Sequence, residues 1–113
     1  MNKLTIDRIL DFYDVPQLLI AKDALEIKYL CLLYEDKTSL KYTAIRISNN
    51  RLQEFISGER DLRDLFANPE PPSEYFDVEY KDDFYFIEPH KGATIEEERL
   101  PLSGYKLTDD YNL

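Results

Sequence analysis

The alternation of apolar and polar residues predicts three consecutive strands in the first half of the chain. A short apolar run within residues 17–22 is bounded by Pro16 and Asp23, which favours a buried strand over a helix. Residues 26–34 carry apolar side chains at odd and even positions, so this strand should be central and covered on both faces. A third strand is predicted over residues 41–47. Because the connections are short, an antiparallel meander is the simplest arrangement.

Apolar residues at helical spacing predict three helical segments. An N-terminal helix is expected over residues 4–13, where the apolar positions fall near a period of three to four. The polar run 48–50 supplies capping side chains for a helix over residues 51–57, and Gly58 is well placed to end it. A second helix of this pair is predicted over residues 61–67.

The second half of the chain predicts an acidic hairpin and an irregular tail. Three prolines make residues 68–73 a stiff connector. Beyond it, apolar and polar residues alternate over residues 76–81, and a second strand at residues 84–88 follows a turn at residues 82–83. From Pro89 onward, glycine, proline and glutamate signal irregular structure.

Together these elements predict an α+β fold in a single domain over residues 1–113. It would contain an N-terminal helix, an antiparallel three-stranded meander, a short helical pair, and a C-terminal acidic hairpin with an irregular tail. A chain of 113 residues is long enough for one core and too short for two.

Charge narrows the classes of partner. The chain carries 14 basic and 23 acidic residues, a formal net charge of −9. Residues 1–56 are neutral overall, with eight basic and eight acidic side chains, so the whole excess lies in residues 57–113. Direct binding to nucleic acid or to an anionic membrane is therefore disfavoured, whereas a basic protein surface fits.

Several features predict a cytoplasmic protein. Cys31 is the only cysteine, so no intramolecular disulfide can form, and its apolar neighbours place it in a core strand. The first ten residues include Lys3, Asp7 and Arg8 and lack the apolar core of a signal peptide. No stretch approaches the roughly 18 apolar residues of a membrane span.

The order of residues from 13 to 69 resembles a family of small uncharacterised bacterial and phage-associated α+β domains. The residues that carry this resemblance are Tyr13-Asp14-Val15-Pro16, Ala21-Lys22-Asp23, Tyr29-Leu30, Ser48, Arg51-Leu52, Gly58, Asp61-Leu62-Arg63 and Phe66. The resemblance implies a bacterial or phage setting and an α+β fold. It covers about half of the chain and implies no catalytic or binding residue.

The residues offer little for catalysis. His90 is the single histidine, in an expected loop, and a lone titratable group lacks the partners that acid–base catalysis needs. Cys31 is interpreted as a structural thiol rather than a nucleophile. The acidic run at residues 96–98 lacks the ligand spacing of a calcium loop. We therefore expect no enzymatic activity, no catalytic residue, no metal and no cofactor.

The acidic hairpin is the predicted partner-binding surface. Strand alternation leaves about half of its aromatic residues off the core face, and exposed tyrosine beside carboxylates suits a protein interface. The predicted contact residues are Tyr75, Asp77, Glu79, Asp82, Tyr85 and Glu88. The same tyrosines could instead cover a thin core or a homodimer seam.

These observations favour a non-enzymatic protein-interaction module, such as an inhibitor, immunity protein or accessory protein. A first alternative is an acidic nucleic-acid mimic that occupies the basic groove of a DNA- or RNA-handling protein. A second is a small-ligand sensor with a pocket between the meander and the helices. The partner and the oligomeric state are left open.

Overall fold

The computed structural model describes residues 2–69, 74–91, 95 and 99–101 and contains six strands and two helices in these ranges. In chain order they are β1 (Asn2–Tyr13), β2 (Val15–Lys22), β3 (Lys28–Glu35), β4 (Leu40–Arg46), α1 (Asn49–Ile56), α2 (Leu62–Ala67), β5 (Glu74–Lys81) and β6 (Phe84–Lys91). Among the described residues, no helix is long and apolar enough to cross a membrane.

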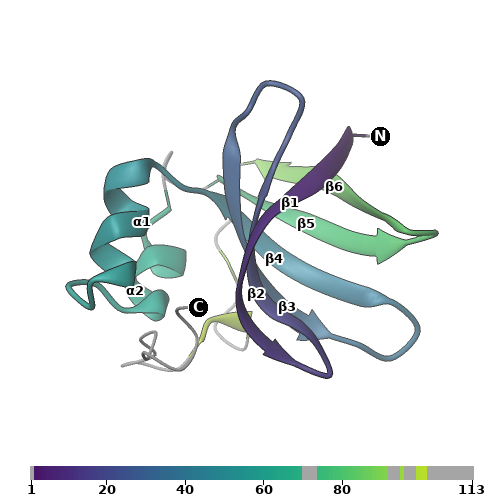
Figure 1. The fold of residues 1–113 in the computed structure, drawn as a ribbon, viewed down its shortest axis with the longest axis horizontal. Helices are drawn as coiled ribbons and strands as arrows, with labels where there is room; N and C mark the ends of the chain where they lie inside the picture. Colours follow the sequence, from purple (N-terminus) through teal and green to yellow (C-terminus); the bar gives the residue numbers. More distant parts are fainter. Residues whose placement is uncertain (1, 70–73, 92–94, 96–98, 102–113) are drawn as a thin grey trace.

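The six strands form a closed antiparallel barrel, so the predicted α+β fold is wrong. Each strand pairs with its neighbour in the chain, and β1 pairs with β6 over Asn2–Leu4 to close the ring. The two helices lie to one side of the barrel (Figure 1). Strands occur where the meander was predicted, but β2, β3 and β4 are half of a barrel rather than a sheet of three.

The predicted N-terminal helix is the long strand β1. Its pairing with β2 shifts register between Ile6 and Arg8 and again between Ile9 and Asp11. At a β-bulge, two residues of one strand oppose one residue of the other, which interrupts the two-residue alternation. Apolar residues then recur at intervals of two and three, which imitates a helical period.

The core consists of two layers, one on each side of the strands β2 to β5. Inside the barrel lie Leu4, Leu19, Ala21, Tyr29, Cys31, Tyr42, Ala44, Phe76, Val78, Tyr85 and Ile87. Between the barrel wall and the helices lie Leu10, Leu18, Ile20, Leu30, Ile45, Ile47, Leu52, Phe55, Leu62, Leu65, Phe66 and Tyr75. Both faces of β3 are thus covered, as its continuous apolar pattern predicted.

Local signals define both helices. The Ser48 side chain accepts a hydrogen bond from the backbone N–H of Arg51 at the start of α1. Asp61 does the same for the N–H of Asp64 at the start of α2. Gly58 follows α1 with φ +85°, a left-handed conformation that favours glycine. The helical pair therefore lies where the sequence predicts it.

The acidic hairpin is also present, and it extends further than predicted. β5 and β6 pair from Glu74↔Lys91 to Lys81↔Phe84. Asp82 and Asp83 form the turn, with φ +53° and +70°, as in a type I′ turn. β6 runs through Pro89 to Lys91, so irregular structure does not begin at Pro89. Most of the predicted tail lies outside the described residues.

Candidate functional site

The structure divides the six predicted contact residues into two half-buried carboxylates, two exposed carboxylates and two buried tyrosines. Asp77 and Glu79 lie half-buried on β5, whereas Glu88 on β6 and Asp82 in the turn are exposed. Tyr75 and Tyr85 are only 6% and 8% exposed. The expectation that both tyrosines project among the carboxylates is therefore wrong.

The two tyrosines are buried because the hairpin is covered on both faces at their positions. Tyr75 packs in the layer beneath the helices. Tyr85 points into the barrel, where its ring lies 4.7 Å from that of Tyr80 and 5.9 Å from that of Tyr42, centroid to centroid. Alternation places a side chain on one face of a strand, but it does not reveal what covers that face.

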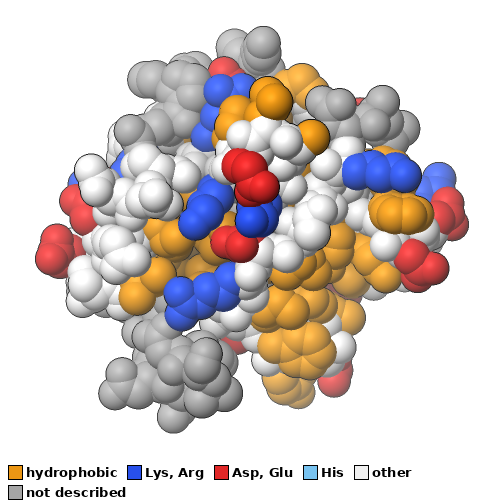
Figure 2. Space-filling view, turned by 45° about the horizontal axis from the view of Figure 1, so that its top comes forward, with side chains coloured by type: hydrophobic (Ala, Val, Ile, Leu, Met, Phe, Trp, Pro, Cys, Tyr) orange, Lys and Arg blue, Asp and Glu red, His pale blue; other side chains and the backbone are white. Residues whose placement is uncertain are grey.

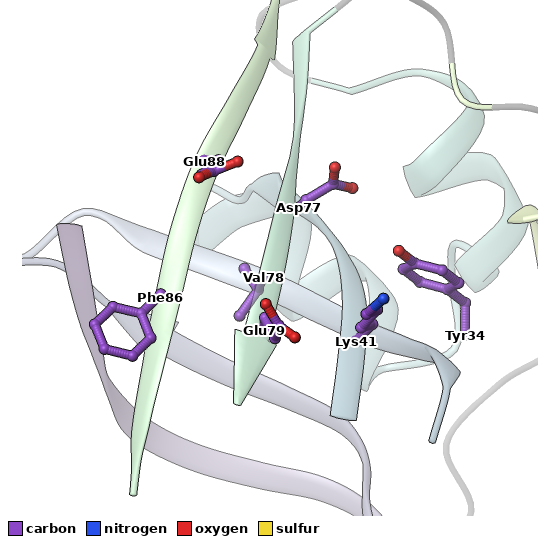
Figure 3. A pocket seen from close by; sticks show the side chains of 7 residues that line it. All are labelled: Tyr34, Lys41, Asp77, Val78, Glu79, Phe86 and Glu88. Carbon is purple, nitrogen blue, oxygen red and sulfur yellow. The ribbon is translucent and has the colours of Figure 1, made fainter. Parts of the chain in front are cut away.

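Three of the predicted carboxylates meet in one groove on the outer face of the barrel. The groove has a volume of about 240 Å³ and is lined by Tyr34, Lys41, Asp77, Val78, Glu79, Phe86 and Glu88. Figure 3 shows the carboxylates of Asp77, Glu79 and Glu88 along β5 and β6, with Lys41 and Tyr34 on the neighbouring strands. We call it the acidic groove. Sequence reasoning missed its members from β3 and β4, because only the strand pairing brings them beside the hairpin.

Like charges face one another across the acidic groove. Asp77 stands directly opposite Glu88 in the antiparallel register of β5 and β6. Directly opposed side chains in such a pair lie about 4.5–5.5 Å apart at Cβ, and like charges there are destabilising. On the other side of β5, Glu79 stands opposite Lys41, which is a favourable pair. Negative charge is therefore concentrated toward β6.

Residues beside the groove hold the side chains of Glu79 and Lys41 in place. The hydroxyl of Ser39 donates a hydrogen bond of 2.6 Å to Glu79. The ammonium of Lys41 lies 3.3 Å from the carboxylate of Glu35, and this hydrogen bond raises the pKa of Lys41. Glu88, by contrast, is exposed at the open side of the groove.

Arg99 lies at the edge of the acidic groove, where it contacts an aromatic ring, a carboxylate and a hydroxyl group. Its guanidinium lies 4.0 Å from the ring centre of Tyr34 and donates a 3.0 Å hydrogen bond to Asp77. It also donates to Oγ1 of the fully buried Thr43, over 3.0 and 2.6 Å. Burial raises the pKa of the Tyr34 phenol, although the charge of Arg99 opposes that shift. An aromatic face, a carboxylate and a hydroxyl thus hold one cation here.

The described residues bring neither the cysteine nor a metal-binding cluster to this site. Cys31 is fully buried inside the barrel, and desolvation raises the pKa of its thiol, which confirms its interpretation as a core residue. Among the residues that the structure describes, no three histidine, cysteine, aspartate or glutamate side chains are arranged so that they could hold a metal ion. His90 lies in β6 rather than in a loop, and its side chain is outside what the structure describes. The interactions shown at this site are those that hold the guanidinium of Arg99 and the ammonium of Lys41.

Comparison with known proteins places the chain in a family. The model of a family described as "Family of unknown function (DUF6575)" matches residues 1–112, and the chain belongs to this family. The predicted membership of a family of uncharacterised domains is confirmed at that level. No curated protein and no solved structure matches the chain.

Proposed function

We propose that the protein is a non-enzymatic interaction module that binds a basic segment of a partner protein in the acidic groove. The observation that carries the proposal is the opposition of Asp77 and Glu88 across β5 and β6. Arg99 already pairs with Asp77 within the chain, so the exposed Glu88 carries the charge that a partner's lysine or arginine would neutralise. The resemblance over residues 13–69 supports a bacterial or phage system, and we propose a cytoplasmic inhibitor, immunity or accessory protein.

The way Arg99 is bound supports this choice of partner. It demonstrates that the groove edge can hold a guanidinium between Tyr34 and Asp77. Glu88 and Glu79 lie further along the same groove, within reach of a second and third cation on an extended basic segment. Such rim carboxylates accelerate association and set its salt dependence more than they slow dissociation.

Two observations weigh against a small-ligand sensor. The space between the barrel wall and the helices, where its pocket was predicted, is filled by a layer of buried apolar side chains. The acidic groove is also a poor fit. Its volume of about 240 Å³ is below the roughly 300–1,000 Å³ of small-molecule sites, and its lining is mostly charged. A nucleic-acid mimic would use the same acidic surface. It differs from our proposal because its partner would be a DNA- or RNA-handling protein, from which it would displace the nucleic acid. Competition by duplex DNA for a protein partner would therefore favour the mimic.

A basic peptide provides the direct test. We expect a fluorescent nona-arginine peptide to bind the full chain, with an affinity that falls as salt rises. The combined change Asp77→Asn, Glu79→Gln and Glu88→Gln should weaken binding about tenfold, since each exposed ion pair contributes about 0.2–1 kcal/mol.

A charge-matched control distinguishes the groove from the net charge. Glu26→Gln, Asp36→Asn and Glu59→Gln remove the same three charges from exposed positions in three loops. Equal weakening by the two triple variants would refute a specific groove.

A second readout is stability. Glu88→Gln should raise the free energy of unfolding by a few tenths of a kcal/mol, because it removes the repulsion with Asp77.

A further inference from the structure

One end of the barrel interior forms a pocket that we call the barrel mouth. It is bordered by the loop between β2 and β3, which projects beyond the strands in Figure 1. Three of its residues belong to the interior cluster. The mouths of β-barrels are common positions for binding sites. The pocket has a volume of about 230 Å³ and is lined by Asp23, Leu25, Ile27, Tyr29, Arg46, Phe76, Ile87 and Pro89.

Arg46 brings a positive charge to the inner side of the barrel mouth. It lies two residues after Ala44 on β4, and Ala44 faces the barrel interior, so alternation turns Arg46 to the same face. It stands directly opposite Tyr29 of β3. Its guanidinium lies 5.7 Å from the ring centre of Phe76, within the range of a cation–π contact.

The guanidinium of Arg46 has hydrogen-bonding capacity to spare. Its Nε is buried and has no hydrogen-bond partner in the described part of the chain. Its Nη2 lies 3.4 Å from Oε1 of Glu74, and this oxygen also accepts no hydrogen bond there. The two side chains therefore form a loose ion pair. The Arg46 side chain is 41% exposed, so a ligand can approach it from solvent.

The other polar group of the barrel mouth is already satisfied. Asp23 accepts hydrogen bonds from the backbone N–H groups of Leu25 and Ile27, at 2.9 and 3.1 Å. The hydroxyl of Tyr29 donates a third, at 3.0 Å. These donors compensate the charge of Asp23 and hold the loop in place. What the mouth still offers is a cationic donor beside an apolar wall.

Charges of both signs surround the barrel mouth. Lys22 and Lys28 form the last pair of β2 and β3 before the loop. Asp7 lies 3.6 and 3.8 Å from their two ammonium groups. Figure 2, in which the top of Figure 1 is turned toward the reader, shows Lys and Arg side chains beside Asp and Glu side chains on this face. A small anion therefore meets no uniformly negative surface here.

We propose that the barrel mouth binds a carboxylate on a short apolar stem, with Arg46 as its cationic partner. The planar guanidinium would donate to both carboxylate oxygens, and the stem would lie against the apolar wall. The end of a peptide chain and a small carboxylic acid share this chemistry. A volume of about 230 Å³ suits a group of this size rather than a drug-sized ligand. The barrel mouth shares no lining residue with the acidic groove, so the two proposals are independent.

The experiment is an NMR titration of the isotope-labelled full chain with three probes of similar shape. Butyrate should shift the backbone amide signals of Leu25 and Ile27, with an affinity in the millimolar range. Butyramide lacks the charge and should bind about tenfold more weakly, and butylammonium should cause no shift. Equal binding of butyrate and butyramide, or butyrate shifts that lie only outside the mouth, would overturn the proposal.

A fourth probe distinguishes the two sources of the carboxylate. Acetylated glycyl-leucine with a free C-terminal carboxylate is compared with its C-terminal amide. If the free dipeptide binds more tightly than butyrate, the ligand is the end of a peptide chain. If it binds more weakly, the ligand is a small acid. Binding of the amide as tightly as the free dipeptide would count against the proposal.

Variants test the role of Arg46 in two opposite directions. Arg46→Gln should weaken butyrate binding at least about tenfold, since it removes the cation. Glu74→Gln removes the carboxylate that competes for the guanidinium, so it should strengthen butyrate binding, and it keeps the test open if the first variant does not fold. Lys37→Gln is the matched control, because it removes one positive charge from an exposed position in the loop between β3 and β4. Unchanged affinity in either folded mouth variant, or an equal loss in the control, would refute the assignment.

Discussion

Replacing Thr43 with valine tests how the segment around Arg99 is attached to the barrel. Thr43 is fully buried, and its Oγ1 accepts two hydrogen bonds from Arg99, one from Nε at 3.0 Å and one from Nη2 at 2.6 Å. Valine keeps the shape of the side chain and removes the acceptor, which leaves two guanidinium donors without this partner. Hydrogen bonds to charged groups contribute about 1.5–3 kcal/mol, so Thr43→Val should lower the free energy of unfolding by about 2 kcal/mol.

A double-mutant cycle attributes that loss to the pair. Arg99→Met keeps the apolar stem of the side chain and removes the charge, the bond to Thr43 and the stacking on Tyr34. Once Arg99 is gone, Thr43→Val should cost almost nothing, which gives a coupling of about 1.5–2 kcal/mol. Urea unfolding followed by circular dichroism measures each corner, with Thr38→Val in the exposed loop before β4 as the control. A coupling near zero, or an equal loss in the control, would refute the attachment.

Other predictions concern the turns and the buried groups. Asp83→Gly should raise the free energy of unfolding by about 0.5–1 kcal/mol, because φ is +70° at this position. Gly58→Ala should lower it by about 1 kcal/mol through backbone strain alone, since an added Cβ would touch nothing within 4 Å; thermal melts measure both. Cys31 should react with a thiol reagent only as fast as the protein unfolds, because it is fully buried. Burial raises the pKa of the Tyr42 phenol, so the folded chain holds this proton more tightly than the unfolded chain. That stabilisation is complete below the unfolded pKa of about 10 and is lost as pH rises above it, so tyrosinate absorbance should appear together with unfolding.

The parts of the fold that the sequence predicts correctly depend on local signals. Ser48 and Asp61 cap the helices, and the paired aspartates at residues 82–83 form the hairpin turn. The unbroken apolar pattern of β3 predicts burial on both faces, and the structure confirms it. Each of these features is decided within about ten residues of the chain.

The parts that fail depend on contacts between distant residues. Bulges in β1 conceal its alternation, and closure rests on Leu4 meeting Tyr85, 81 positions along the chain. The acidic groove has the same origin, because Tyr34 and Lys41 reach the hairpin only through the register of β3, β4 and β5. The error about Tyr75 also arises here, since the helices that cover it come from another segment. No pattern within a single strand contains this information.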